Sequence, residues 1–230
     1  MPRGVEQVQA AIEAHSLANI DDYVKTSTMH PELEEAVQHH ILLELKSWFF
    51  FRKLSCDCAR ANIALHGFNL LFKRCAIECF ADANWLECYL VQRGGICRPV
   101  DIPAPTVAFP DDPVDPVQPV YEALRVEKAI LEDAIRLCKL ADKHGDYPLD
   151  DAIETRFLKK ETKHVKDMGD LLQQCVRVSK DVGHGVYHLD KELRWKKGIT
   201  PWAKENNPDN NDLLLKEAAK DLHDPLLYPQ

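Results

Sequence analysis

The chain has 230 residues, 45% of them hydrophobic, and a formal net charge of −8 at pH 7. That length suits one ordinary domain with a substantial core and an extension at each end. The acidic balance argues against nucleic-acid binding, and no apolar run resembles a signal peptide or reaches the ~20 residues of a membrane span. We therefore expect a cytoplasmic protein that binds neither nucleic acid nor a membrane.

Residues 1–30 read as an N-terminal extension with one possible short helix over 5–17. Pro31 stands where the first position of a helix tolerates proline, because the missing N–H would be unpaired there anyway. Apolar residues then recur at helical spacing, which predicts a first long helix over about 31–54.

A second long amphipathic helix is predicted over about 63–93, and Gly94-Gly95 ends it. Seven prolines follow between 99 and 119, which excludes a helix there. We read this stretch as an extended connector. A four-helix bundle accommodates one such long crossover, because it lets consecutive helices run parallel.

Two further long helices and a short one complete the pattern. The third is predicted over about 117–144 with Gly145 at its end, the fourth over about 150–182, and a short fifth over about 186–197. The fold expected is an all-α four-helix bundle with one long crossover between helices 2 and 3 and a short fifth helix.

We assign the bundle to residues 31–198 and the C-terminal tail to 199–230, within which 211–223 could form one more helix. The eight cysteines fall mostly inside helical patterns, so we expect free thiols rather than disulfides. We expect His39, His40, His184, His188 and His223 on the surface.

Several polar residues stand on the apolar faces of these helices. The first helix offers Glu44, the third Glu127, and the fourth Glu161-x-x-His164. Bundles of this connectivity can bind two metal ions with one Glu from each of two helices and Glu-x-x-His from the other two. Taken alone, a residue such as Glu44 is more often a buried acid paired with Lys, Arg or Tyr than a ligand, but Glu127, Glu161 and His164 in register with it favour a metal site or its vestige.

The second helix departs from that pattern, because Cys79 and Asp82 stand where Glu and His are expected. A thiol is a soft ligand that oxidises readily, whereas hard metal ions prefer oxygen and imidazole donors. Asp82 can still donate an oxygen if the backbone lies close enough. The two residues are either a relic of a metal site or ordinary packing.

Short motifs occurring in order make residues 30–198 resemble a ferritin subunit. They are Leu43-Glu44-Leu45, Gln92-Arg93-Gly94-Gly95, Val126-Glu127-Lys128, Ile153-Glu154-Thr155, Lys166-Asp167-Met168-Gly169-Asp170 and Leu189-Asp190-Lys191. The resemblance implies a hollow shell of twenty-four subunits that stores ferric mineral, built as a homo-oligomer or with other ferritin chains. It also implies iron as the bound metal, with a diiron centre that oxidises Fe(II) with oxygen in active chains.

By this resemblance Glu44 and Glu127 match retained ligand positions, and Glu161 falls where the family has Gln or Glu. These three would carry any ferroxidase activity. His164 resembles the bacterioferritin-like variant of its helix, and Asp82 would be the substitute ligand.

Three departures predict an impaired or atypical ferroxidase centre: Cys79, Asp82, and Phe51 in place of the usual tyrosine. The alternatives are a catalytically inactive structural subunit that co-assembles with active chains or binds partners through its tails, and a small bundle whose tail prevents shell assembly.

The resemblance also implies that Asp151 and Glu154 line a threefold entry channel, where three copies would make a ring of carboxylates that attracts cations. The alternative is that both are acidic residues in the first turn of a helix, where the helix dipole favours them.

Overall fold

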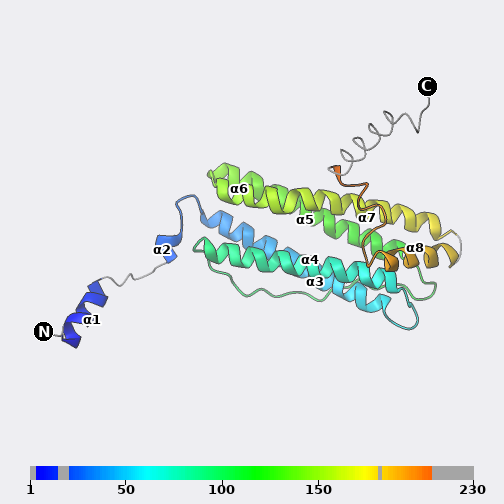
Figure 1. The fold of residues 1–230 in the computed structure, drawn as a ribbon, viewed down its shortest axis with the longest axis horizontal. Coiled ribbons are helices and arrows are strands. Elements are labelled where there is room, and N and C mark those ends of the chain that lie inside the picture. The colour runs from blue at the N-terminus through cyan, green and yellow to red at the C-terminus, as the bar shows by residue number, and fades with distance from the viewer. Residues whose placement is uncertain (1–3, 15–20, 181–182, 209–230) are drawn as a thin grey trace, which may run out of the picture.

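The computed structural model describes residues 4–14, 21–180 and 183–208, so the helix expected over 211–223 lies outside the described residues. Helices account for most of this part of the chain (Figure 1). They are α1 (Val5–Ala14), α2 (Asp21–Val24), α3 (Pro31–Cys58), α4 (His66–Gln92), α5 (Val117–His144), α6 (Tyr147–Ile153), the π-helical segment η1 (Glu154–Leu158), α7 (Lys159–Val178) and α8 (His184–Trp195).

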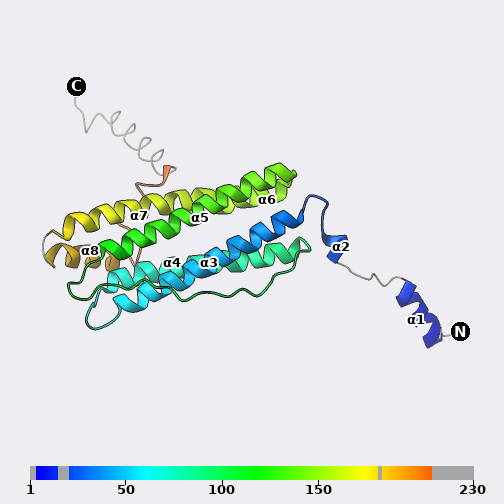
Figure 2. The ribbon, with the colours of Figure 1, turned by 180° about the vertical axis from the view of Figure 1, so that it is seen from behind.

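The four arms of a bundle are α3, α4, α5 and the continuous rod made by α6, η1 and α7 (Figures 1 and 2). Helices α3 and α4 form an antiparallel hairpin, and the connector over 93–116 then runs back along it, so that α5 begins at the end where α4 began. The predicted all-α bundle with a long crossover and a short fifth helix is confirmed. No helix in the described part of the chain is long and apolar enough to cross a membrane.

Local sequence explains where these helices begin and end. His30 caps α3 with its ring nitrogen, which accepts a hydrogen bond from the Glu32 N–H at 3.1 Å, and Pro31 occupies the first helical position. Gly145 ends α5 in the left-handed conformation at φ 66°. Asp146 then caps α6 by accepting from the Leu149 N–H.

One prediction about the fourth helix is wrong in detail. We expected a continuous α-helix from about residue 150, whereas the five-residue π-helical segment η1 separates α6 from α7. A π turn takes more residues than an α turn, so it shifts the angular position of everything after it. The polar residues at the start of α7 therefore do not follow the α-helical register of Asp151 and Glu154.

The core consists of two apolar clusters, one toward each end of the bundle. One is centred on Phe51, Phe68 and Phe72, and the other on Leu86 and Phe157, all fully buried. Along each of the four arms, buried acidic side chains occupy the stretch between these clusters.

Helix α8 packs across the end of α4 and supplies a cap that α4 lacks. No side chain at the start of α4 accepts a hydrogen bond from its own first turn, but Asp190 Oδ1 accepts from the N–H groups of Gly67 at 2.7 Å and Phe68 at 3.0 Å. The approach is so close that a Cβ on residue 67 would lie 1.9 Å from the Asp190 carbonyl oxygen. Glycine at position 67 is therefore required for this docking.

We expect Asp190→Ala to lower the free energy of unfolding by about 1–2 kcal/mol, because it removes the only side-chain cap of α4 seen in the described structure. Denaturant unfolding measures this change. Asp190→Asn retains an acceptor oxygen and serves as the control. Equal losses for the two variants would contradict the capping role.

Candidate metal centre

The five predicted metal ligands meet in one small cavity between the four arms. Its volume is about 10 Å³, room for roughly one water-sized body. The lining consists of Glu44, Cys75, Glu78, Cys79, Asp82, Glu127, Ile130, Lys160, Glu161 and His164. The structure thus brings together the five predicted ligands and Cys79, whereas Phe51 does not line this cavity; that the five bind metal stays a prediction.

Within this cavity Glu127, Glu161 and His164 form a compact trio, whose ligand atoms all lie within 4.8 Å of one another. His164 Nδ1 is 3.6 Å from Glu161 Oε2 and 3.9 Å from Glu127 Oε2, and its other ring nitrogen is 3.8 Å from Glu78 Oε2. These separations are too long for hydrogen bonds. The donor atoms therefore surround a gap of a size that one cation could fill.

Lys160 occupies the other side of the cavity. Its ammonium group forms an ion pair with the Asp82 carboxylate and lies 3.1 Å from Glu161 Oε1. Arg156 reaches the second Asp82 oxygen at 3.2 Å. A protein cation therefore already bridges α4 and α7 at the place where the sequence pattern suggested a metal ligand.

Sequence reasoning missed Lys160. Adjacent residues on a helix project about 100° apart, so a lysine beside the inward Glu161 is expected to face solvent. In the structure its side chain is 30% exposed, and its long stem carries the ammonium back to Asp82. An acid in the core with no assigned counter-ion was the one available signal.

Burial and neighbouring charges set the protonation states of the site. Burial raises the pKa of Glu44 well above its ordinary value and that of Glu127 to about 8. Burial opposes ionisation of Glu161 too, but His164 and Lys160 hold its pKa below the usual range. Burial disfavours the charged imidazole of His164, yet Glu161 and Glu127 raise its pKa to about 9. Near neutral pH the cavity thus balances its own charges without a metal ion.

These shifts predict that the metal-free protein loses stability as the pH rises from about 6.5 to 9. A histidine whose pKa is raised from 6.5 to about 9 stabilises the folded state below 6.5, and that contribution disappears through this window. Glu127 acts with the same sign, because its unfolded carboxyl ionises near 4.5 while the folded one remains protonated to about 8. Chelator-treated protein should lose about 1–3 kcal/mol of unfolding free energy. A profile for His164→Gln as steep as that of the unmodified chain would contradict this origin.

His40 corrects an expectation, because it is fully buried rather than on the surface. Its Nδ1 lies 2.7 Å from Asp133 Oδ2, and its Nε2 lies 3.7 Å from Glu44 Oε1. His40 Nε2 and Glu44 Oε1 both lack a hydrogen-bond partner among the described residues. The i, i+4 spacing places His40 on the same inward face as Glu44, which the polar pair His39-His40 concealed. Burial opposes ionisation of Asp133, but His40 and Arg136 lower its pKa to about 2.

The cysteines behave as expected from their placement in helices. All eight lie in described residues and none forms a disulfide. Burial raises the pKa of Cys79 and of Cys75 well above the ordinary value. Both thiols are therefore protonated, and Cys79 presents an uncharged sulfur to the cavity.

A larger cavity of about 170 Å³ adjoins the small one and shares Cys75, Glu78, Glu127 and His164 with it. Gly198, Ile199, Thr200 and Ala203, just after α8, form part of its wall. The segment is held there by Asn206, whose side-chain amide donates to Asp167 at 2.7 Å and to Asp170 at 2.8 Å. The second cavity thus reaches the site on the side of Glu127 and His164.

The two residues expected at a channel are both exposed. Asp151 lies in α6 and Glu154 is the first residue of η1. A ring of these carboxylates needs symmetry copies of the chain, so the channel stays a prediction.

Comparison with known proteins identifies the bundle. Residues 34–178 match the family model named Ferritin and described as a ferritin-like domain. The chain belongs to the ferritin family. Among curated ferritins it is 32% identical over 165 residues to ferritin-3, chloroplastic, of Arabidopsis thaliana, a match covering 71% of this chain and 62% of the relative.

Two other ferritins show the range of this similarity. Ferritin-2, chloroplastic, of Vigna unguiculata is 32% identical over 70% of this chain and 64% of its own length. Soma ferritin of Lymnaea stagnalis is 29% identical over 71% of this chain and 91% of its own length. The chain thus spans less than two thirds of the plant ferritins it matches. The plant names specify the chloroplast for those proteins, and the cytoplasmic location expected for this chain stays a prediction.

Proposed function

We propose that this chain is a shell-forming, iron-storage ferritin subunit whose centre within the bundle is deficient in Fe(II) oxidation. The observation that carries the proposal is the Lys160 ammonium, which is paired with Asp82 and Glu161 inside the cavity. A cation of the protein itself thereby takes the place of one of two metal ions.

The donor set supports one metal position rather than two. Iron in either oxidation state prefers carboxylate and imidazole ligands, which Glu127, Glu161 and His164 provide. On the α4 side the candidates are a protonated thiol and a carboxylate already bound to two cations. A cavity of about 10 Å³ also leaves no room for a second ion beside the first without displacing Lys160.

Storage is retained in this proposal because it requires the shell rather than the centre. Asp151 and Glu154 would form the cation-attracting entrance to a shell of twenty-four subunits, made from this chain alone or with other ferritin chains. Fe(II) oxidation would then depend on a co-assembled active subunit. The second candidate function is a structural subunit with no role in iron handling. It is also favoured by a cavity whose charges balance without a metal ion, and it differs from the first only in whether iron enters the shell.

The experiment compares the unmodified chain with Glu127→Ala. We first expect a large hollow particle by size exclusion with light scattering. On adding Fe(II) in air, absorbance near 300 nm should rise no faster for either protein than for buffer, because the centre lacks a second metal position. Shells that also contain an active ferritin chain should oxidise and retain iron.

Three outcomes would count against the proposal. Fast oxidation that Glu127→Ala abolishes would show a working centre. Mixed shells that never load iron would indicate the purely structural subunit. A small particle would remove storage altogether and leave only the fold.

A further inference from the structure

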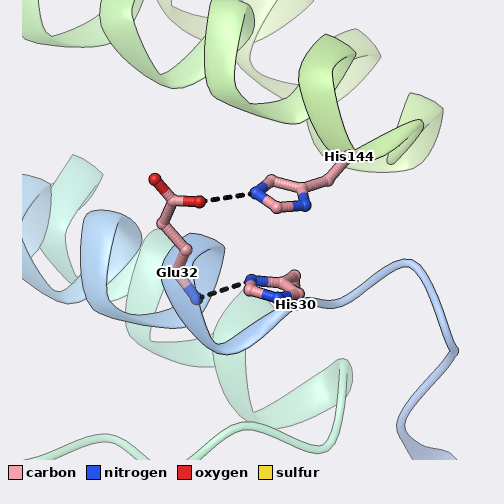
Figure 3. A group of neighbouring side chains, drawn as sticks. All are labelled: His30, Glu32 and His144. Atoms are coloured by element: carbon pink, nitrogen blue, oxygen red, sulfur yellow. Dashed lines mark hydrogen bonds and ion pairs between the residues drawn. The ribbon is translucent and has the colours of Figure 1, made fainter.

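A second group of metal-ligand side chains lies at the far end of the bundle from α8. It consists of His30 and Glu32 at the start of α3 and His144 at the end of α5 (Figure 3). One ring nitrogen from each histidine and one carboxylate oxygen lie within 4.8 Å of one another. None of the three belongs to the cavity described above.

The geometry of the group is close and ordered. The two imidazole rings stack with centroids 4.2 Å apart and planes 13° apart. His144 Nε2 lies 2.7 Å from Glu32 Oε2, and because a carboxylate only accepts, the imidazole donates this hydrogen bond (Figure 3). The proton of this hydrogen bond lies between His144 Nε2 and Glu32 Oε2, two atoms that can each bind a metal ion.

Helix ends hold the two histidines in place. His30 is the N-cap of α3 and is followed by Pro31. His144 is the last residue of α5 and is followed by Gly145 in the left-handed conformation. The helix ends therefore fix the backbone at two ligands that are far apart in sequence. Because His30 Nδ1 already accepts from the Glu32 N–H, its Nε2 is the nitrogen left for a metal, and one of the stacked rings must rotate so that both lone pairs meet at one ion.

We propose that His30, Glu32 and His144 bind a divalent first-row transition-metal ion that joins the start of α3 to the end of α5. Two imidazoles and one carboxylate are the protein ligands of known zinc sites that leave a fourth position to water. The same donor types suit other first-row divalent ions. On binding, His144 takes the tautomer with its proton on Nδ1: Nε2 releases its proton to solvent, Nδ1 takes one up, and the lone pair of Nε2 then faces the metal opposite Glu32.

Lys143 is the competitor for this site. Its ammonium lies 2.9 Å from Glu32 Oε2 and 3.3 Å from Oε1. The lysine side chain is 61% exposed and that of Glu32 45%. An exposed pair of this kind contributes little free energy, so a metal ion can displace the ammonium into solvent at small cost.

The chain contains a natural comparison in His184 and His188 on α8. Their Nε2 atoms lie 3.2 Å apart with i, i+4 spacing, but the metal-ligand groups found in the described structure add no carboxylate to them. They provide two ligands rather than three, so the α3–α5 site should bind more tightly.

Zinc titration calorimetry on the assembled protein in chelator-treated buffer tests the proposal. The variant His30→Asn/His144→Asn removes both imidazoles while asparagine retains the N-cap of α3. This variant should bind one Zn²⁺ ion fewer per chain than the unmodified protein. The matched control His184→Asn/His188→Asn should still bind that ion, and Lys143→Met should raise its affinity by about twofold to fivefold.

Unchanged stoichiometry and affinity in His30→Asn/His144→Asn would overturn the proposal. If that variant does not fold, Glu32→Gln decides instead, because it retains the shape of the side chain and loses only the ligand charge. Undiminished zinc affinity in Glu32→Gln would also overturn it. Neither result depends on Fe(II) oxidation, so this site and the proposed storage function fail separately.

Discussion

Replacing Lys160 with methionine should destabilise the metal-free protein and, at the same time, allow a divalent ion to stabilise it. Methionine has a similar volume but no charge, so Asp82 and Glu161 lose their shared counter-ion. Breaking a buried pair costs ~3–5 kcal/mol. Because Lys160 is 30% exposed and Arg156 still reaches Asp82, we expect about 2–3 kcal/mol here.

Denaturant unfolding with and without Zn²⁺ measures both effects. Metal should raise the unfolding midpoint of Lys160→Met more than that of the unmodified chain, because the vacated position is lined by ionised carboxylates. Adding Asp82→Asn should recover part of the loss, since the unpaired charge is then removed. A double-mutant cycle gives that coupling directly.

Lys166→Met is the matched control, because Lys166 forms an i, i+4 ion pair with Asp170 on the same helix but is 59% exposed. It should cost less than about 1 kcal/mol and should leave the effect of zinc unchanged. Similar losses for the two lysines would show that Lys160 is not a buried counter-ion.

The fold could be predicted from the sequence because its signals are local. The helix ends are marked by Pro31, by the glycines after α4 and α5, and by the proline-rich connector. Between these marks, the helical spacing of apolar residues predicts the helices themselves. The π-helical segment η1 has no such mark. Its sequence reads as ordinary helix, and only packing against the rest of the bundle decides the extra residue in the turn.

The sequence identified the acidic residues of the site. It did not identify Lys160 as their counter-ion or His40 as a buried neighbour. Glu44, Glu127 and Glu161 are conspicuous on apolar faces, because a buried carboxylate needs an explanation. Lys160 lies beside the face rather than on it, and its reach through a flexible stem is a tertiary property. His40 was hidden by its neighbour, although its spacing from Glu44 contained the signal.

The triple change Cys79→Glu, Asp82→His and Lys160→Ala should give the bundle a centre with two metal positions. It supplies the carboxylate and imidazole that the pattern requires on α4, and it removes the ammonium and most of the stem that fill the cavity. Metal affinity should rise by at least roughly 10- to 100-fold over the unmodified chain, the range that single supporting groups contribute at metal sites. Oxidation of Fe(II), followed near 300 nm, should become faster than in buffer.

Stepwise variants separate charge from ligand identity. Lys160→Ala alone should bind metal more tightly without fast oxidation, because Cys79 still occupies one ligand position. Cys79→Glu/Asp82→His with Lys160 retained should remain inactive, because the ammonium then pairs with the new glutamate. The metal-free triple variant should also unfold more readily, since several carboxylates share one buried cavity that has lost the Lys160 ammonium. Fast oxidation in the double variant that retains Lys160 would show that the ligands alone were at fault and that the lysine does not block the centre.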